Sequence, residues 1–205
     1  MIAIIDYGMG NKYSVYNALN YIGEDAVITN KENEIKDADR LILPGVGAFG
    51  SAMENLAKTG LLDVLNEEVL VKGKPFLGIC LGMQMVAETG TEKGLFKGLG
   101  WVEGEVKKLE PDHPSLNLPH VGWNDIIIQR ENPLFKGLKK ELAFYFVHSY
   151  AFKAGKEENI AAQCDYGGLF TAAVQKNNIF ATQFHPEKSQ KNGLVILENF
   201  SRWRG

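Results

Sequence analysis

The stretch PFLGICLGMQ, residues 75–84, decides the fold. A short apolar run ends at Cys80, which has a glycine two residues away on each side, and residues suited to a helix follow it. This order predicts a strand that turns tightly into a helix, as in a nucleophile elbow. Gly78 and Gly82 suit such a turn because side chains at these positions would collide with neighbouring backbone. A helix that begins beside the sulfur would lower the pKa of the thiol and raise the fraction of reactive thiolate.

The same turn would supply part of an oxyanion site. We expect the N–H of Leu81 to point to where an oxyanion forms. A second donor is expected from the glycine-rich residues 44–47, which directly follow another predicted strand and let the backbone expose N–H groups. A buried strand with a packed cysteine would show the same apolar run. A catalytic Cys80 therefore requires a base elsewhere in the chain.

Length and composition are ordinary for a soluble globular chain. Of 205 residues, 45% are hydrophobic and 23% are charged, so we expect one domain over residues 1–205. A net charge of −3 and a pI near 5.9 give no sign of a surface for nucleic acid or a membrane. Cys80 and Cys164 form no C-x-x-C pair, and no basic leader and no run of about 18 apolar residues occurs. We therefore expect a cytoplasmic protein with reduced cysteines.

The first half of the chain alternates apolar strands with amphipathic helices. Strands are predicted at residues 2–5, 26–29, 40–43 and 76–80. A helix is predicted after the first strand, and Ser51 with Glu54 forms a capping-box pattern at the start of another. This order is typical of a doubly wound α/β sheet, in which ligands bind at the carboxyl ends of the strands.

The second half is predicted to add short strands linked by turns. These strands are expected at residues 101–109, 126–128, 143–147, 160–162, 172–174 and 179–182. The segment HVGWN, residues 120–124, is placed at a turn, and a final amphipathic helix is predicted from about Gly193. We expect antiparallel additions to the sheet.

His185 is the best candidate for the base. Glu187 follows it by two residues, and Pro186 fixes the turn between them, so the carboxylate can hold one ring nitrogen and leave the other facing a nucleophile. No spacing typical of metal ligands occurs, and Cys164 is expected to be a packed thiol. A dinucleotide is not expected either, because the third glycine of the G-x-G-x-x-G pattern is replaced by Tyr13. We therefore predict no metal and no other cofactor.

Three separated segments resemble the motifs of one family. They are PGVG at residues 44–47, GICLGMQ at 78–84 and FHPEKS at 184–189. Over essentially its whole length the chain resembles the class I (triad) glutamine amidotransferases. Within that class, DYGMGN at residues 6–11, GWN at 122–124 and HSY at 148–150 resemble the glutaminase subunits of imidazole glycerol phosphate synthase. The resemblance implies a flavodoxin-like, mostly parallel sheet flanked by helices.

The resemblance also implies a mechanism. The Cys80 thiolate would attack the side-chain amide of glutamine, His185 would pass a proton to the departing ammonia, and Glu187 would hold His185. The glutamyl thioester would then be hydrolysed to glutamate, with backbone N–H groups of Leu81 and Gly47 holding the oxyanion. The residues implied to bind glutamine are Gly45, Gln84, His148, Ser149 and Tyr150.

A heterodimer is the last implication of the resemblance. Similar proteins dock on a (β/α)8-barrel cyclase, which uses the ammonia to make imidazole glycerol phosphate and aminoimidazole carboxamide ribotide in histidine biosynthesis. The residues implied at that interface are Asn11, Lys12, His120, Trp123, Asn124 and Lys188.

Alternative functions stay open at the level of the sequence. Lys12-Tyr13 stands where many relatives carry Leu-Arg, so a paralogous glutaminase could instead supply ammonia to a sugar-amidating enzyme of surface-polysaccharide synthesis. A cysteine hydrolase or peptidase of related α/β fold is a second hypothesis. A non-catalytic module that binds phosphate at residues 8–10 is a third, but it leaves the pairing of His185 with Glu187 unexplained.

Overall fold

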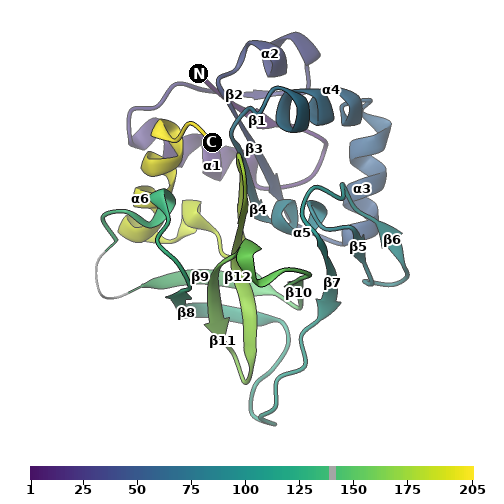
Figure 1. Ribbon diagram of the computed structural model, residues 1–205, viewed down its shortest axis with the longest axis vertical. Coiled ribbons are helices and arrows are strands. Elements are labelled where there is room, and N and C mark those ends of the chain that lie inside the picture. The colour runs from purple at the N-terminus through teal and green to yellow at the C-terminus, as the bar shows by residue number, and fades with distance from the viewer. Residues whose placement is uncertain (139–141) are drawn as a thin grey trace.

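The computed structural model describes residues 1–138 and 142–205. Within these ranges a sheet of nine strands forms the centre of the molecule (Figure 1). Its strands, in spatial order, are β2 (Ala26–Thr29), β1 (Ile2–Ile5), β3 (Arg40–Gly45), β4 (Phe76–Cys80), β13 (Ile179–Thr182), β12 (Leu169–Lys176), β11 (Ile160–Asp165), β8 (His120–Ile128) and β9 (Ala143–His148). The first five run parallel, and each of the others runs antiparallel to its neighbour. The predicted α/β fold with antiparallel additions is therefore confirmed.

Helices cover both faces of the parallel part of the sheet. They are α1 (Lys12–Tyr21), α2 (Glu32–Asp37), α3 (Phe49–Lys58), α4 (Leu62–Asn66) with a following π-helical turn (Glu67–Val71), α5 (Leu81–Met85) and α6 (Gln190–Arg202). Short 3-10 turns occur at Pro133–Phe135, Glu157–Asn159 and Pro186–Lys188. In the described part of the chain, no helix combines the length and apolar character needed to cross a membrane.

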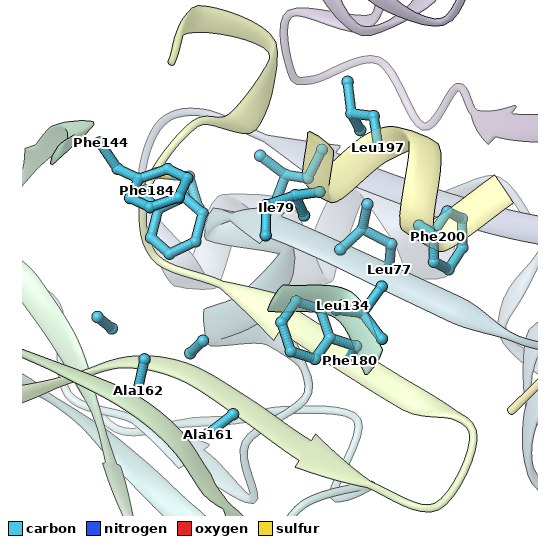
Figure 2. Close-up of a cluster of buried hydrophobic side chains, with 14 of the residues drawn as sticks. Leu77, Ile79, Leu134, Phe144, Ala161, Ala162, Phe180, Phe184, Leu197 and Phe200 are labelled. Carbon is cyan, nitrogen blue, oxygen red and sulfur yellow. The ribbon is translucent and has the colours of Figure 1, made fainter. Parts of the chain in front are cut away.

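Two apolar layers follow from the alternation of side chains along each buried strand. In β1, Ile2 and Ile4 join the layer under α1 and α6, whereas Ala3 and Ile5 join the layer under α2, α3 and α4. Figure 2 shows the first layer, in which Leu77 and Ile79 of β4 lie beside Leu197 and Phe200 of α6. Because β4 is buried on both faces, the strand that leads to Cys80 is held firmly from above and below.

A second, smaller sheet lies beside the first. Its strands, in spatial order, are β10 (Tyr150–Ala154), β7 (Gly104–Lys108), β5 (Thr89–Gly90) and β6 (Phe96–Lys97). Of these, only β7 falls within a strand predicted from the sequence. β10 was missed because it starts two residues after β9 ends, so the chain changes sheets with no turn signal between them.

Three local predictions are wrong. Residues 120–124 are not a turn but the first half of β8, paired with β9 from His120 opposite His148 onward. Helix α3 begins at Phe49, ahead of the proposed capping box, because the carboxylate of Glu92 accepts a hydrogen bond from the Phe49 N–H at 2.9 Å. Helix α6 begins at Gln190, three residues before Gly193.

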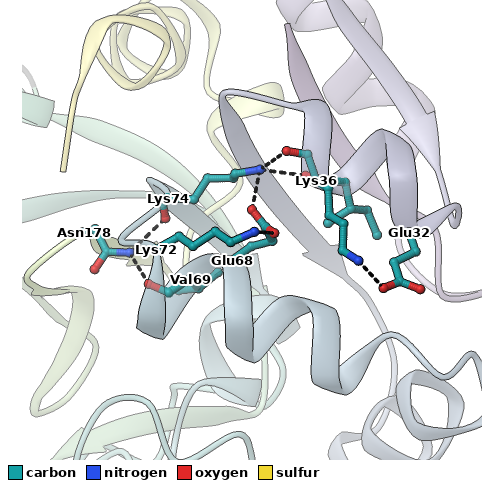
Figure 3. A network of polar contacts seen from close by, with 8 residues as sticks. Glu32, Lys36, Glu68, Val69, Lys72, Lys74 and Asn178 are labelled. Carbon is teal, nitrogen blue, oxygen red and sulfur yellow. Dashed lines mark hydrogen bonds and ion pairs between the residues drawn. The ribbon is translucent and has the colours of Figure 1, made fainter.

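A buried carboxylate fixes the entry to β4 (Figure 3). The Glu68 side chain is almost fully buried and pairs with the ammonium groups of Lys72 and Lys74 at 2.7 and 2.8 Å. Burial raises the pKa of Glu68, but the hydrogen bonds from both lysines lower it, and the net direction is down. Lys74 also donates to the carbonyl of Lys36 at the end of α2, and Asn178 donates to the carbonyl of Lys74. These contacts tie α2, the π-helical turn and the β12–β13 hairpin together where β4 starts.

Candidate active site

The turn from β4 into α5 is a nucleophile elbow. Cys80 ends the strand with φ of 55°, a backbone angle that is strained for any residue with a side chain, and α5 begins at the next residue. A Cβ atom on Gly82 would lie 1.8 Å from the carbonyl oxygen of Leu43, and one on Gly78 would lie 2.7 Å from the carbonyl oxygen of Gly82. Both glycines are therefore required by the packing, as the sequence predicted.

Strand pairing brings the base to the nucleophile. β13 lies next to β4 in parallel, with Thr182 opposite Ile79, so the residues that follow the two strands emerge at the same edge of the sheet. His185 follows β13, and its backbone N–H donates to the carbonyl of Tyr145 at 2.9 Å. Its ring Nδ1 lies 2.7 Å from Oε1 of Glu187, and both side chains are 1% exposed. Nε2 is therefore the ring nitrogen left for Cys80.

The electrostatics favour a charged histidine. Burial alone would lower the pKa of His185, but its interactions with Cys80 and with Glu187 raise the pKa to about 10. The imidazolium is thus stabilised between a sulfur and a carboxylate. This arrangement favours a proton on His185, next to a sulfur whose thiolate would be the reactive form in nucleophilic catalysis.

Two further groups contact the sulfur. The side-chain Nε2 of Gln183 lies 3.6 Å from Sγ of Cys80, and the backbone carbonyl of Val147 lies 4.0 Å from it. No role of Gln183 is predicted from the sequence. Its only signal was its position directly after the last predicted strand, two residues before His185.

A cavity of about 420 Å³ opens beside Cys80. Its lining residues are Val46, Gly47, Ala48, Cys80, Leu81, Gln84, Glu92, Lys93, Pro119, Val147, His148, Ser149 and Tyr150. The expected oxyanion residues and four of the five residues expected to bind glutamine thus lie around one space. A larger cavity of about 580 Å³ lies between the two sheets and contains none of the three triad candidates.

Gly45 does not line this cavity. A Cβ atom there would lie 2.7 Å from both the Leu81 Cβ and the Tyr7 hydroxyl, so the glycine lets β3 pack against the elbow. Gly47 has φ of 113°, which a residue with a side chain rarely adopts. Gly47, the second residue expected to hold the oxyanion, therefore has a backbone angle that favours glycine.

Part of the surface beside His185 is aromatic and basic. The Trp123 ring is 48% exposed and lies 6.1 Å from the Tyr145 ring, and Nζ of Lys188 lies 5.7 Å from the centre of the same ring. The Tyr145 ring in turn lies 6.4 Å from the His185 ring. Two of the residues expected at a partner interface therefore meet close to the proposed base.

Three other residues expected at the partner interface have side chains that contact groups within the chain. Asn11 caps α1 by accepting from the Ser14 N–H, Lys12 pairs with Asp6, and Asn124 donates to the carbonyl of Asp165.

The expectation for His120 needs correction. Its side chain is 2% exposed and stacks on Tyr166 with ring centres 3.9 Å apart, so it is a core residue and not part of the surface. The reason is that His120 opens β8 on the face that packs inward, whereas Trp123 lies on the opposite face.

Comparison with known proteins decides the family. A family model described as glutamine amidotransferase class-I matches residues 3–202. The chain belongs to this family. The amidotransferase is 50% identical over 202 residues to imidazole glycerol phosphate synthase subunit HisH 1 of Campylobacter jejuni subsp. jejuni, covering 98% of this chain and 100% of the relative. It is 46% identical to imidazole glycerol phosphate synthase subunit HisH 2 of Nitrobacter winogradskyi, covering 98% of each.

Solved structures agree with the amidotransferase fold. PurLQS from Thermotoga maritima superposes with a TM-score of 0.73 at 18% identity, covering 98% of this chain and 97% of that one. The glutaminase domain of Trypanosoma brucei CTPS with bound acivicin gives a TM-score of 0.66 at 17% identity, covering 98% and 93%. At these identities the likeness concerns the fold alone.

Proposed function

We propose that the protein is the glutaminase subunit of an imidazole glycerol phosphate synthase. It hydrolyses L-glutamine to glutamate and ammonia and delivers the ammonia to a synthase subunit. The observation that carries the proposal is Cys80 on a strained elbow beside the His185–Glu187 pair, at the wall of a cavity large enough for an amino acid. Relatives named as subunits of this synthase match over their full length, which favours this partner over the polysaccharide alternative.

The first half of the reaction forms a thioester. The Cys80 thiolate attacks the side-chain carbonyl carbon of glutamine, and the carbonyl oxygen becomes an oxyanion held by the N–H groups of Leu81 and Gly47. A single such donor is worth on the order of 10²–10³ in rate. The C–N bond then breaks while Nε2 of His185 gives its proton to the departing nitrogen, so that ammonia leaves as a neutral molecule.

The second half restores the enzyme. Nε2 of His185 takes a proton from a water molecule, and the resulting hydroxide attacks the thioester carbonyl. The C–S bond breaks, sulfur leaves as thiolate, and glutamate is released. Glu187 keeps the imidazole oriented throughout, because its carboxylate holds Nδ1 at 2.7 Å.

Residues that line the same cavity as Cys80 would recognise glutamine. Nε2 of Gln84 donates to the carbonyl of Tyr150 at 2.8 Å and to Oε1 of Gln183 at 3.1 Å. The amide nitrogen of Gln84 thus donates both of its hydrogen bonds to protein groups. Its Oε1 is therefore the atom suited to accept from the substrate ammonium group. Ser149 and His148 also line the cavity, whereas Gly45 acts by letting the elbow pack closely.

Ammonia needs a protected route because it is protonated in water and lost. The proposed partner is a (β/α)8-barrel cyclase that docks over Trp123 and Lys188, two exposed residues beside the Tyr145 ring that neighbours His185, with Asn11, Lys12 and Asn124 at the periphery. An exposed tryptophan is a typical interface anchor.

The test is Cys80→Ala in the complex with the cyclase subunit from the same organism. Product formation from glutamine should be abolished, while added ammonium salt still supports synthesis. Loss of both activities would contradict the assignment of Cys80 to the glutaminase step alone.

Co-purification of the wild-type chain separates the two partner hypotheses, because a sugar-amidating enzyme in place of the barrel protein would overturn the histidine-pathway assignment. A peptidase would cleave its substrate without any partner.

A further inference from the structure

Gln183 is a fully buried amide beside the reactive sulfur. Its residue is 0% exposed, its backbone N–H donates to the carbonyl of Ala172 at 2.8 Å, and its side-chain Nε2 lies 3.6 Å from Sγ of Cys80. A buried amide must place its donors and acceptors on protein groups, because leaving them unpaired costs the full desolvation penalty. The side chain therefore has a defined orientation, and which of its two ends faces sulfur matters chemically.

The carbonyl of Tyr150 sets that orientation. A carbonyl oxygen only accepts hydrogen bonds, so the atom of Gln84 that lies 2.8 Å from it must be the amide nitrogen. The same nitrogen lies 3.1 Å from the Gln183 side chain, which must present its oxygen there. The NH₂ group of Gln183 is consequently the end that faces Cys80. Gln183 therefore donates a hydrogen bond to the sulfur and does not accept one.

The neighbouring histidines are fixed by the same carbonyl. Nδ1 of His148 lies 2.9 Å from the Tyr150 oxygen and so carries the ring proton, and burial lowers the pKa of His148 to about 3. Nε2 of the neutral ring must then accept, and it does so from Nδ1 of His120 at 3.1 Å. Both nitrogens of His148 and Nδ1 of His120 are thus engaged in this chain of hydrogen bonds. Among the hydrogen bonds of the described residues, Gln183 is the neutral side chain that donates to the sulfur.

We propose that the Nε2–H of Gln183 stabilises the thiolate of Cys80, with Gln84 and the Tyr150 carbonyl holding the amide in the donating orientation. The inference rests on the proposed function, in which Cys80 is the nucleophile. It has a clear physical basis, since a donor favours thiolate whereas the nearby Val147 carbonyl, an acceptor, favours thiol. The same donor assists the second half of the reaction, when the C–S bond breaks and sulfur regains its negative charge.

The test compares Gln183→Leu with Gln183→Glu in the full-length chain. Leucine removes the donor. Glutamate keeps the size and still accepts from Gln84, but it turns an acceptor toward sulfur. The readout is the rate of Cys80 alkylation by iodoacetamide as a function of pH, measured by peptide mass spectrometry. Cys164 is silent in this assay because it is buried and burial raises the pKa of its thiol to about 12. Gln129→Leu, at an exposed glutamine, is the matched control.

The expected result is a rise of about one unit in the apparent pKa of Cys80 in Gln183→Leu, a larger rise in Gln183→Glu and none in Gln129→Leu. The kcat for glutamine should fall in the same order. A role in packing alone would make leucine at least as harmful as glutamate, and that order, or unchanged profiles in both, would overturn the proposal. In the wild-type chain the side-chain amide NMR signal of Gln183 should titrate with the Cys80 pKa, which decides the matter if either variant fails to fold. An unreactive wild-type Cys80 would instead overturn the proposed function.

Discussion

Oε1 of Glu187 lies 2.7 Å from Nδ1 of His185, and neither side chain reaches solvent. The two residues are separated by a single proline within a 3-10 turn, so the pair is set by local geometry. Cys80 and the Glu187 carboxylate together raise the pKa of His185, so in the proposed mechanism a proton stays available for the departing ammonia.

Replacing Glu187 by Gln should therefore slow the chemistry. We expect kcat to fall about 10²- to 10⁴-fold with a small change in the glutamine KM, since the carboxylate orients the base and does not line the cavity. The limb of the pH profile that reports His185 should move to lower pH. Steady-state kinetics across pH, with Glu157→Gln on the surface as control, measure both effects. A kcat within twofold of wild type would show that Glu187 does not support the base.

Gly82→Ala tests the elbow. The added methyl group would lie 1.8 Å from the Leu43 carbonyl, so β3 and α5 must separate. We expect a loss of about 3 kcal/mol in the free energy of unfolding, together with loss of glutaminase activity. Gly155→Ala is the matched control, because its nearest neighbours would lie 3.3 Å away. Equal stabilities of the two variants in denaturant titrations would contradict the packing described here.

The buried histidine pair makes stability depend on pH. Burial lowers the pKa of His120 to about 4 and that of His148 to about 3, below the usual value near 6.5. The unfolded chain therefore binds more protons below about pH 6.5, and stability should fall as pH drops from there toward 4. Between about pH 7 and pH 5, wild type should lose about 1 kcal/mol more than His120→Phe, which keeps the ring stacking. Parallel pH dependences in urea titrations would refute this.

Two tyrosines offer a paired stability test. The Tyr7 hydroxyl is buried without a hydrogen-bond partner among the described residues, whereas the Tyr166 hydroxyl donates to the carbonyl of Asn117 at 2.9 Å. Tyr7→Phe should leave the free energy of unfolding unchanged or higher, and Tyr166→Phe should lower it by about 1 kcal/mol. The reverse order would mean that the Tyr7 hydroxyl is paired in solution.

The sequence revealed those features that depend on neighbours along the chain. The elbow depends on close backbone contacts at Gly78 and Gly82, both within two residues of Cys80. The contact between His185 and Glu187 depends on the short turn that joins them. The amphipathic stripe of α1 and the alternating layers of β1 are equally local. These elements could be predicted because the physics that fixes them is visible in short windows.

Features that depend on distant partners could not be predicted. Residues 120–124 carry a mixture of polar, aromatic and glycine residues, and they become a strand only because β9 pairs with them. The first N–H of helix α3, that of Phe49, donates to the carboxylate of Glu92, some 40 residues along the chain. The contact of Gln183 with Cys80 likewise exists only because β13 lies beside β4. The sequence pairs His185 with Glu187 and proposes His185 as the base for Cys80, but the approach of the two also depends on β13 lying beside β4.

The most direct test of the central claim uses an electrophilic analogue of glutamine, a chloroketone that alkylates a thiol held in the glutamine site. Treated at neutral pH, the wild-type chain should lose glutaminase activity in step with the gain of one adduct, which peptide mass spectrometry should place on Cys80. Excess glutamine should protect the thiol, and Cys164 should stay unmodified. Full inactivation with the adduct on another residue, or a Cys80 that stays unmodified while activity is lost, would contradict the account.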